Sequence, residues 1–386
     1  MPRWIKRLAA ALAIMVAVGL AVLAVAISHD APCGAQAPAA ASGATMKAVV
    51  RRCYGPPDVL AVEGVGRPDL PDDRMLVRVH AAGLNPLDWH RLRGTPYLMR
   101  LGEGLGAPQD VRMGIDFAGT VLAVGKGVTK FKPGDEVFGG RSGALAQYVA
   151  VREQGTIAIK PANISFEQAG GAYVAGITAL QALRDRAGVR PGQKVLVNGA
   201  SGGVGTFAVQ VAKWLGAEVT AVCSTRNLDL VRSLGADHVI DYTTTDFTQG
   251  AARYDVIMDN VANRSIHDIR RVLAPTGKYI LIGGGGPDAN PWFGAFLAPL
   301  KAFVVSWFVD QDMGFFISAA NTADVETLAR LMAEGRVRPV VDRTYPLAEV
   351  AQAMRYFEAG RARGKVVVLP GRDRPTSAGT GAGSRD

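Results

Sequence analysis

The sequence is poor in the residues that build disulfide frameworks and metal sites. Its 386 residues include three cysteines and five histidines. Cys33, Cys53 and Cys223 are far apart and odd in number, so they predict neither a disulfide framework nor a CxxC metal knuckle. Four histidines are not spaced along the sequence as the ligands of a metal ion would be: His80, His90, His238 and His267. We therefore expect no bound metal.

A basic stripe interleaved with aromatic residues, which nucleic-acid binding requires, is also missing. The formal net charge is +9, but Arg3, Lys6 and Arg7 supply three of the charges and precede an apolar run, and the others are scattered. We expect no nucleic-acid partner. The hydrophobic fraction of 48% supplies enough core for two ordinary domains at this length.

One long run lacks charge altogether. Residues 8–27, LAAALAIMVAVGLAVLAVAI, form a helix whose length of about 30 Å would match a bilayer core. A cleavable signal usually has a shorter apolar region of about 7 to 15 residues, and Pro38 follows the nearest small-x-small site, 35–37. An uncleaved single-pass anchor is therefore favoured over a signal peptide. The basic residues before the run predict a cytoplasmic N-terminus and a chain that continues outside.

Beyond this run the pattern changes twice. The anchor and a small, uncharged linker make up residues 1–45. Short alternating strands are typical of residues 46–168, whereas strands and helices alternate through 169–315, as in a doubly wound parallel sheet. Helix, strand, helix and strand follow in 316–370. The Gly/Ser/Arg-rich tail, 371–386, is predicted to be disordered. The fold class is therefore α/β.

A glycine-rich turn, NGASGGVG, connects a predicted buried strand at 194–198 to a helix. Free N–H groups at the start of that helix suit a pyrophosphate. Gly202 and Gly203 let the backbone approach the phosphates, and Gly205 lets the helix pack closely on the sheet. Because the turn lies inside a βαβ unit, it predicts dinucleotide binding; a tight turn used only for packing is the alternative.

The next strand, EVTAVC, ends without the acidic residue that an NAD pocket carries. In its place stand Ser224, Thr225, Arg226 and Asn227. A hydroxyl and a guanidinium satisfy a 2′-phosphate through charge-assisted hydrogen bonds, whereas a carboxylate would repel it. The predicted coenzyme is NADPH. The alternative is that Arg226 is a solvated surface arginine.

Longer motifs make a family resemblance specific. NGASGGVGTFAVQVAKWLGAEV, SLGADHVIDY, KPGDEVFGG with AQYVAV, and the closing RARGKVVV resemble the zinc-independent quinone oxidoreductase branch of the medium-chain dehydrogenase/reductase superfamily. The resemblance implies a GroES-like catalytic domain at 46–168, a Rossmann NADP-binding domain at 169–315 and a return to the catalytic domain at 316–370. The active site would lie in the cleft between them. GIDFAG stands where zinc-dependent relatives carry Gly-His-Glu, so zinc is not expected.

By this resemblance the segment GLNPLDWHRLRGTPY lines the substrate side of the cleft. Asn85 would donate a hydrogen bond to the developing oxyanion. Tyr97 would supply a proton, because a phenol with a pKa of about 10 is a suitable acid toward an enolate. The alternatives are a turn asparagine and an ordinary half-buried tyrosine. Tyr54, in the YGPP turn, is a comparable catalytic candidate.

On the coenzyme side, Thr178 and Gly283 resemble positions at the nicotinamide, Asn260 would reach its ribose, and Tyr242 would lie beside the adenosine phosphate. Lys365 follows a family lysine near the cleft, and a solvated lysine at the start of a strand is the alternative. The full predicted coenzyme set is Thr178, Ser201, Gly202, Gly203, Val204, Ser224, Arg226, Tyr242, Asn260, Gly283 and Lys365.

Residues 291–311, PWFGAFLAPLKAFVVSWFVDQ, are apolar and aromatic, but Lys301 interrupts them, so they make a poor transmembrane candidate. One interpretation is packing at the sheet edge, often a homodimer contact in this superfamily. The other is an apolar lip over the cleft that admits quinones or lipid-derived enals from the bilayer.

The expected function is zinc-independent hydride transfer from NADPH to a quinone or an α,β-unsaturated carbonyl, a small hydrophobic electrophile. The alternatives are an NADP-dependent alcohol dehydrogenase or carbonyl reductase, and a non-catalytic binding protein that has kept the fold. The predicted orientation puts the domain outside the cytoplasm, where NADPH is scarce. Either the anchor inverts and keeps Lys47, Arg51 and Arg52 inside, or translation starts at Met46, or the external domain works otherwise.

Overall fold

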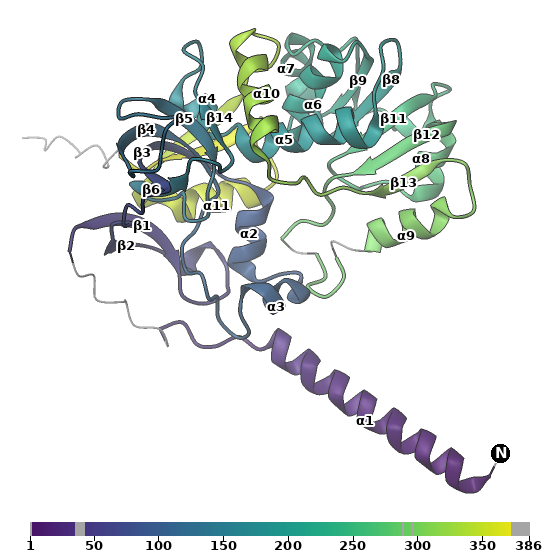
Figure 1. Cartoon of the computed structure of the whole chain (residues 1–386). Coiled ribbons are helices and arrows are strands. Elements are labelled where there is room, and N and C mark those ends of the chain that lie inside the picture. The colour runs from purple at the N-terminus through teal and green to yellow at the C-terminus, as the bar shows by residue number, and fades with distance from the viewer. Residues whose placement is uncertain (1, 35–42, 288, 295–296, 372–386) are drawn as a thin grey trace, which may run out of the picture.

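The computed structural model describes residues 2–34, 43–287, 289–294 and 297–371, and the predicted disordered tail from residue 372 onward lies outside this part. Figure 1 shows a long N-terminal helix attached to a body that contains two large sheets side by side. The α/β class, with an antiparallel-rich sheet and a parallel one, is confirmed.

Helix α1 (Arg3–Ser28) projects away from the body (Figure 1). Its most apolar window of 18 residues has a mean hydropathy of 2.8, and nearly all of that window is exposed. By length and composition this helix could cross a membrane. The helix ends where His29 adopts an extended backbone.

The residues that follow α1 are packed onto the body. Asp30 forms an ion pair of 2.9 Å with Arg100, whose side chain is almost fully buried. The Arg100 guanidinium also donates to the carbonyl oxygens of His29 and Gly94, at 3.1 and 2.8 Å. The backbone N–H of Ala31 donates to the carbonyl of Gly106 at 2.8 Å. The end of α1 is therefore joined to the body at a defined place, which we call the anchor joint.

The expectation that the cysteines form no disulfide is wrong. Cys33 and Cys53 are bonded, with their Cα atoms 5.0 Å apart. Their separation of 20 residues is no obstacle, because the anchor joint fixes residues 29–31 against the body, close to Arg100 and Gly106. Cys223 is free and buried, and burial raises the pKa of its thiol to about 11.

The first large sheet forms the core of the catalytic domain. Its order is β14-β15-β3-β4-β5-β7, with β6 also paired to β3, and β1 and β2 form a separate antiparallel pair. The strands are β1 (Thr45–Arg51), β2 (Leu60–Gly66), β3 (Arg74–Gly83), β4 (Asp116–Val124), β5 (Glu136–Gly140), β6 (Tyr148–Arg152), β7 (Ile157–Ile159), β14 (Val341–Pro346) and β15 (Lys365–Leu369). The last strand in the described part of the chain, β15, thus pairs with β3 inside the first domain.

The second sheet is parallel throughout, in the order β10-β9-β8-β11-β12-β13. Its strands are β8 (Lys194–Asn198), β9 (Glu218–Cys223), β10 (His238–Asp241), β11 (Tyr254–Asp259), β12 (Leu273–Leu281) and β13 (Asp312–Phe315). The strand order reverses between β8 and β11. In such sheets a ligand binds beyond the carboxyl ends of the strands at this switch point.

Helices cover both sheets and connect them (Figure 1). They are α2 (Pro86–Arg93), α3 (Arg100–Glu103), α4 (Phe166–Gly170), α5 (Tyr173–Gln181), α6 (Gly203–Trp214), α7 (Leu228–Ser233), α8 (Ile266–Val272), α9 (Leu297–Ser306), α10 (Thr322–Ala333) and α11 (Val350–Glu358). The helical segment that opens the coenzyme domain is divided into α4 and α5. A β-carbon on Gly170 would lie 2.7 Å from Ala81, so the chain approaches β3 closely at the break.

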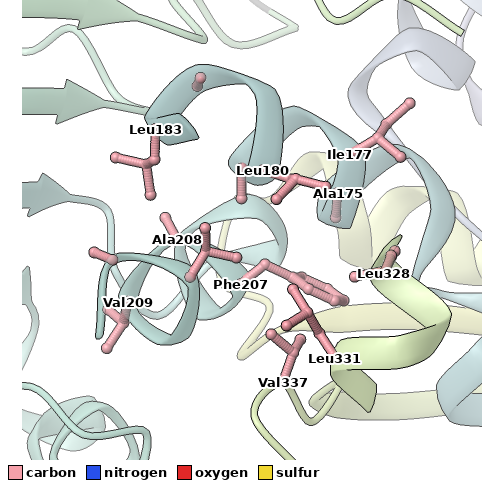
Figure 2. Packing of buried hydrophobic residues seen from close by; sticks show 14 of the residues in the cluster. Ala175, Ile177, Leu180, Leu183, Phe207, Ala208, Val209, Leu328, Leu331 and Val337 are labelled. Atoms are coloured by element: carbon pink, nitrogen blue, oxygen red, sulfur yellow. The ribbon is translucent and has the colours of Figure 1, made fainter. Parts of the chain in front are cut away.

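The interface between the domains contains a continuous apolar core. Figure 2 shows Phe207 of α6 packed toward Leu328 and Leu331 of α10, with Leu180 of α5 beside them. All four side chains are fully buried. Burial of one such side chain contributes about 1.5 to 3 kcal/mol, so this core holds the two sheets in a fixed relation.

Candidate active site

The glycine-rich turn has the backbone that a phosphate site needs. Gly199 has a φ of +74°, a left-handed conformation that favours glycine. A β-carbon on Gly205 would collide with the Gly199 carbonyl oxygen, so only glycine allows α6 to begin this close to β8. At Gly202 a β-carbon would meet only the Gly199 oxygen, at 3.4 Å, so this side of the turn is open. The free N–H groups at the start of α6 therefore face accessible space.

Beyond β9, Ser201 and Ser224 lie close together because both contact the side chain of Asn227, which is not among the predicted coenzyme residues. The Asn227 amide nitrogen donates to Ser201 Oγ at 2.9 Å and to Ser224 Oγ at 3.2 Å. Its Oδ1 is buried, and within the described residues it has no hydrogen-bond partner. The only signal in the sequence is an amide at the position where other dinucleotide pockets place an acid.

Arg226 lies at the exposed rim of this pocket, and its guanidinium donates to the carbonyl oxygen of Arg361. The backbone N–H of Tyr242 donates to the Cys223 carbonyl at 3.0 Å, so this half-exposed phenol lies beside the end of β9. The rim thus presents a guanidinium and hydroxyl groups toward solvent.

An acid does lie nearby, on β10 rather than β9. Asp241 accepts hydrogen bonds from the hydroxyls of Thr225 and Thr243, at 2.5 and 2.7 Å. These hydrogen bonds lower the pKa of Asp241. Both oxygens of the carboxylate are therefore engaged by threonines of the rim.

At the opposite end of the groove, Asn260 follows β11. Its amide nitrogen donates to the Asn198 carbonyl at 2.9 Å, while its Oδ1 is a buried acceptor with no partner in the part of the chain described. A β-carbon on Gly283 would lie 2.8 Å from the Asn260 carbonyl oxygen, so the chain after β12 passes directly against Asn260. Thr178 is buried and donates to the Val174 carbonyl at 2.7 Å.

Two buried acceptors near the carboxyl ends of β9 and β11, Oδ1 of Asn227 and Oδ1 of Asn260, have no hydrogen-bond partner among the described residues, and we call the residues at these strand ends the coenzyme groove. Buried atoms without a described hydrogen-bond partner also occur elsewhere, on Arg51, Arg67, Arg74 and Asp88. Leaving a buried acceptor unpaired costs about 1 to 3 kcal/mol, so such atoms are uncommon in folded proteins. Ribose hydroxyls of a dinucleotide are donors of the required kind. The residues of the groove therefore fit a nicotinamide dinucleotide.

A charged cluster lies where the first residues of β4 and β15 meet the start of α2. Lys365 is buried, and its Nζ donates to the Leu84 carbonyl at 2.8 Å and to Asn85 Oδ1 at 2.5 Å. It also pairs with Asp116 at 3.4 Å. Burial raises the pKa of Asp116, and the lysine opposes that rise. Lys365, predicted on the coenzyme side, has its ammonium group directed into the catalytic domain, and sequence reasoning missed Asp116.

The geometry fixes how the amide of Asn85 is oriented. Because its Oδ1 accepts from Lys365, its Nδ2 is turned the other way, where it makes a long contact of 3.4 Å with the Gly83 carbonyl. The Asn85 side chain is buried, and α2 begins directly after it. The amide N–H group is the donor that the predicted oxyanion role needs.

Asp88, on the first turn of α2, is fully buried. Its Oδ2 accepts from the Asn85 backbone N–H at 2.8 Å, and its Oδ1 has no hydrogen-bond partner among the described residues. Burial raises the pKa of Asp88 to about 7. A carboxyl group that is partly protonated near neutral pH therefore lies next to this charged cluster.

The two candidate tyrosines have different surroundings. The Tyr54 hydroxyl is buried and donates to the Gly104 carbonyl at 2.7 Å, and burial raises its pKa. Tyr97 is only half-buried; its ring packs edge-on against Trp292 at 5.0 Å and lies under the Arg100 guanidinium. A cavity of about 260 Å³ opens beside them, and its lining includes Asp30, Tyr54, Arg93, Pro287, Ala289 and Pro291.

Known proteins resemble both halves of the chain. A family model described as alcohol dehydrogenase GroES-like domain matches residues 71–161, and one described as zinc-binding dehydrogenase matches residues 234–368. The chain is 34% identical over 342 residues to the 2-methylene-furan-3-one reductase of Solanum lycopersicum, over 84% of this chain and 79% of that protein. It belongs to the medium-chain dehydrogenase/reductase family. The predicted family, in its quinone oxidoreductase-like branch, is confirmed.

Other members of this family show the same likeness. The chloroplastic NADPH-dependent alkenal/one oxidoreductase of Arabidopsis thaliana is 35% identical over 342 residues, over 84% of this chain and 80% of that protein. The structure of the quinone oxidoreductase from Coxiella burnetii superposes with a TM-score of 0.72 at 28% identity, over 84% of this chain and 99% of that one. The oxidoreductase class and the nicotinamide coenzyme predicted for the chain are confirmed by these relatives.

Zinc-dependent members of the family hold a metal in the cleft. Among the residues that the structure describes, no group of three or more His, Cys, Asp or Glu side chains is placed to bind a metal ion. His80 lies 2.9 Å from the Thr120 hydroxyl and His90 lies 2.6 Å from the Thr95 carbonyl, so both rings are engaged elsewhere. Zinc independence remains a prediction for this chain.

Proposed function

We propose that the protein is a membrane-anchored, zinc-independent reductase that transfers hydride from NADPH to a quinone or an α,β-unsaturated carbonyl. The observation that carries the proposal is the groove from Arg226 to Asn260, with its open glycine turn and its two unsatisfied acceptors. Reduced nicotinamide supplies the hydride when it is bound. The relatives named as alkenal/one oxidoreductase and quinone oxidoreductase support this substrate class.

Reduction of a conjugated carbonyl places negative charge on oxygen as hydride adds to the β-carbon, and a proton completes the reaction at the α-carbon. A quinone takes one hydride and one proton to become a hydroquinone. Asn85 is suited to bind the developing oxyanion, because Lys365 holds its Oδ1 and polarises the amide toward donation. Lys365 and Asp116 act as positioning residues for Asn85.

Tyr97 is the better proton donor of the two tyrosines. The Tyr54 hydroxyl already donates to Gly104, so its proton is committed to the fold. Tyr97 does not itself line the cavity beside Tyr54, but its backbone N–H donates to the carbonyl of Pro291 in the lining at 2.8 Å, and its ring is held by Trp292 and Arg100. Its phenol donates to no group in the described part of the chain, so its proton is available for transfer.

We also propose that α1 is retained as an anchor. Cleavage at the small-x-small site, 35–37, would remove Asp30 and Cys33. The buried Arg100 guanidinium would then lose its carboxylate, and Cys53 would lose its disulfide partner. Because the Asp30 side chain is 55% exposed, the ion pair itself contributes about 1 kcal/mol or less, whereas loss of the disulfide would cost about 3 kcal/mol. We therefore infer that the segment before residues 35–37 stays attached, because it contributes a disulfide and an ion pair to the folded domain.

The Cys33–Cys53 disulfide also supports the orientation derived from the basic N-terminus, with the catalytic domain outside the cytoplasm. Disulfides persist in oxidising compartments and are rare in the cytosol. The domain would then draw its coenzyme from the compartment on that side of the membrane.

The test is an assay of the purified full-length chain with a panel of quinones, enals and enones, using NADPH and NADH. With Arg226→Glu we expect kcat/KM for NADPH to fall about 100-fold, with NADH little changed, because a carboxylate repels the 2′-phosphate. Arg190→Glu, another exposed arginine of the coenzyme domain, is the matched control. If Arg226→Glu leaves the NADPH preference unchanged, the phosphate assignment is wrong.

A further inference from the structure

The segment around α9 exposes far more apolar surface than its packing requires. Its contact with β13 and the neighbouring core buries only Pro299 and Ala302 fully. The side chains of Trp307 and Phe308 are 70% and 79% exposed. Five further exposed apolar residues belong to this segment: Phe293, Leu297, Leu300, Phe303 and Val304. Packing at the sheet edge therefore accounts for one side of α9 and leaves the other uncovered.

A second exposed apolar group lies on the short turn before α3, on α3 and just after it. Leu98, Leu101 and Leu105 are each more than half exposed. Isolated exposed leucines are ordinary, but contiguous apolar patches on a soluble protein mark a binding surface. We call the two groups together the membrane-facing surface, for the reason given below.

A chain of contacts runs from the end of α1 to Tyr97 and Trp292, which precede the two exposed groups in the sequence. Asp30, two residues beyond α1, pairs with Arg100. The Arg100 guanidinium lies 4.6 Å from the centre of the Tyr97 ring, and that ring packs on Trp292. The Tyr97 backbone N–H donates to the Pro291 carbonyl at 2.8 Å. In Figure 1, α3 lies next to the end of α1, and the chain leading to α9 passes beside α3.

Because these contacts place the exposed groups near the end of α1, a membrane that held α1 would also cover them. If α1 spans a bilayer, the anchor joint lies at the membrane boundary, and the residues fixed to the joint are held there too. Tryptophan and phenylalanine are enriched where protein meets the lipid headgroups. Lys301, exposed on α9, can extend its ammonium group to the headgroups while its stem lies along the apolar face.

We propose that the membrane-facing surface rests in the headgroup region of the bilayer that holds α1, and that the cavity beside the anchor joint admits a lipid-soluble quinone or enal from that bilayer. The cavity has Asp30 of the joint on one side and Pro287 and Pro291 of the α9 approach on the other. Residues 283–286 connect Pro287 to the end of the coenzyme groove. This proposal rests on the proposed function, because it names the phase from which the substrate enters.

The first test places a fluorophore on the full-length chain in phosphatidylcholine vesicles. The fluorophore is attached through Phe308→Cys and, as a control, through Leu122→Cys on β4; Cys223 is buried and its thiol pKa is raised, so it does not compete. Brominated lipids are expected to quench the label at position 308 severalfold and to leave the label at 122 unchanged. Equal signals at both positions would overturn the docking.

The second test separates docking from catalysis. The triple variant Phe303→Ser, Trp307→Ser, Phe308→Ser should lower kcat/KM for a long-chain quinone in vesicles at least 10-fold, with a short-chain soluble quinone changed less than twofold. The matched control is Val62→Ser, Leu122→Ser, Ile159→Ser, which changes three exposed apolar residues of the catalytic domain. Equal effects of the triple variant on both quinones would overturn the proposal.

Failure of the proposed function itself would appear differently, as absence of NADPH-dependent turnover of either quinone by the unmodified chain. Energy transfer between labels on two chains at position 308, without lipid quenching, would identify a second copy as the occupant and overturn the bilayer. Should the triple variant fail to fold, the fluorophore measurement and the single variant Phe308→Ser still decide the question.

Discussion

The anchor joint and the coenzyme groove differ in whether their buried polar atoms have partners within the protein. At the joint, the Arg100 guanidinium donates through Nε to Gly94, through Nη1 to His29, and through Nη2 pairs with Asp30. In the coenzyme groove, Oδ1 of Asn227 and Oδ1 of Asn260 are buried, and nothing in the described part of the chain donates to them. Both regions are polar, but only at the anchor joint does every nitrogen of the guanidinium have a partner.

This difference separates structure from function. A satisfied network stabilises the fold without any ligand, whereas unsatisfied acceptors raise the free energy of the folded state until a donor arrives. Substitutions at the joint should therefore lower stability, and substitutions in the groove should weaken coenzyme binding with little effect on stability. Measurements of unfolding free energy and of NADPH affinity distinguish these two effects.

The largest effect is expected at Arg100. Arg100→Met removes the guanidinium and leaves the carbonyls of Gly94 and His29 without their donor, which should lower the free energy of unfolding by about 2 to 5 kcal/mol. Denaturant unfolding of the full chain in detergent measures this loss. NADPH affinity of the remaining folded protein should stay within twofold. A larger change in affinity would show that the joint and the groove are coupled.

The disulfide comes next. Cys33→Ser with Cys53→Ser should lower the free energy of unfolding by about 3 kcal/mol, because the bond closes a loop of 20 residues in the unfolded chain. The same loss should appear in the unmodified protein after reduction. In cells, thiol alkylation before and after reduction should reveal two protected cysteines. If both are alkylated without reduction, the chain lies in a reducing compartment and the proposed orientation is wrong.

Asp88 predicts a pH dependence. Its folded pKa of about 7 lies above the ordinary value of 3.8, so the native state binds the extra proton between these values. Its contribution to stability is therefore present at low pH and is lost as pH rises from about 4 to 7, with a slope approaching 1.4 kcal/mol per pH unit. Asp88→Asn should remove this slope from the unfolding free energy. Parallel pH profiles for the two proteins would contradict the assignment.

The smallest effect is expected at Asn260. Asn260→Ala removes an acceptor that has no described protein partner, so NADPH binding should weaken about fivefold, the equivalent of one hydrogen bond of about 1 kcal/mol. It also removes the amide donor to the Asn198 carbonyl, so a matched variant, Asn260→Asp, which keeps the acceptor and loses the same donor, is the control for stability. Titration calorimetry measures the affinity, and thermal unfolding of the coenzyme-free protein should change by much less than it does for Arg100→Met. A strong loss of stability with unchanged affinity would reverse the comparison.

The sequence was sufficient where the relevant contacts are local. The turn between β8 and α6 depends on residues within about eight positions, and Gly205 was correctly expected to permit close packing. The parallel sheet followed from the alternation of strand and helix, and the family followed from motifs such as SLGADHVIDY. These features are written in short stretches of chain.

The features that could not be predicted depend on distant partners. Lys365 lies 249 residues from Asp116, and nothing near it in the sequence shows that its ammonium group points toward Asn85. Cys33 and Cys53 pair in a region where Arg100 holds His29 and Asp30 against the body, a contact that cysteine spacing does not reveal. The exposure of Phe303 likewise depends on which face of α9 meets β13.

The position of β15 has a consequence for folding. This strand is the last in the described part of the chain, yet it lies between β14 and β3 and carries Lys365 into the first domain. The carboxylate of Asp116 therefore gains its Lys365 partner only when β15 has paired with β3. The charged cluster around Asn85 thus depends on a contact between segments 249 residues apart, which is a slow kind of contact to form during folding.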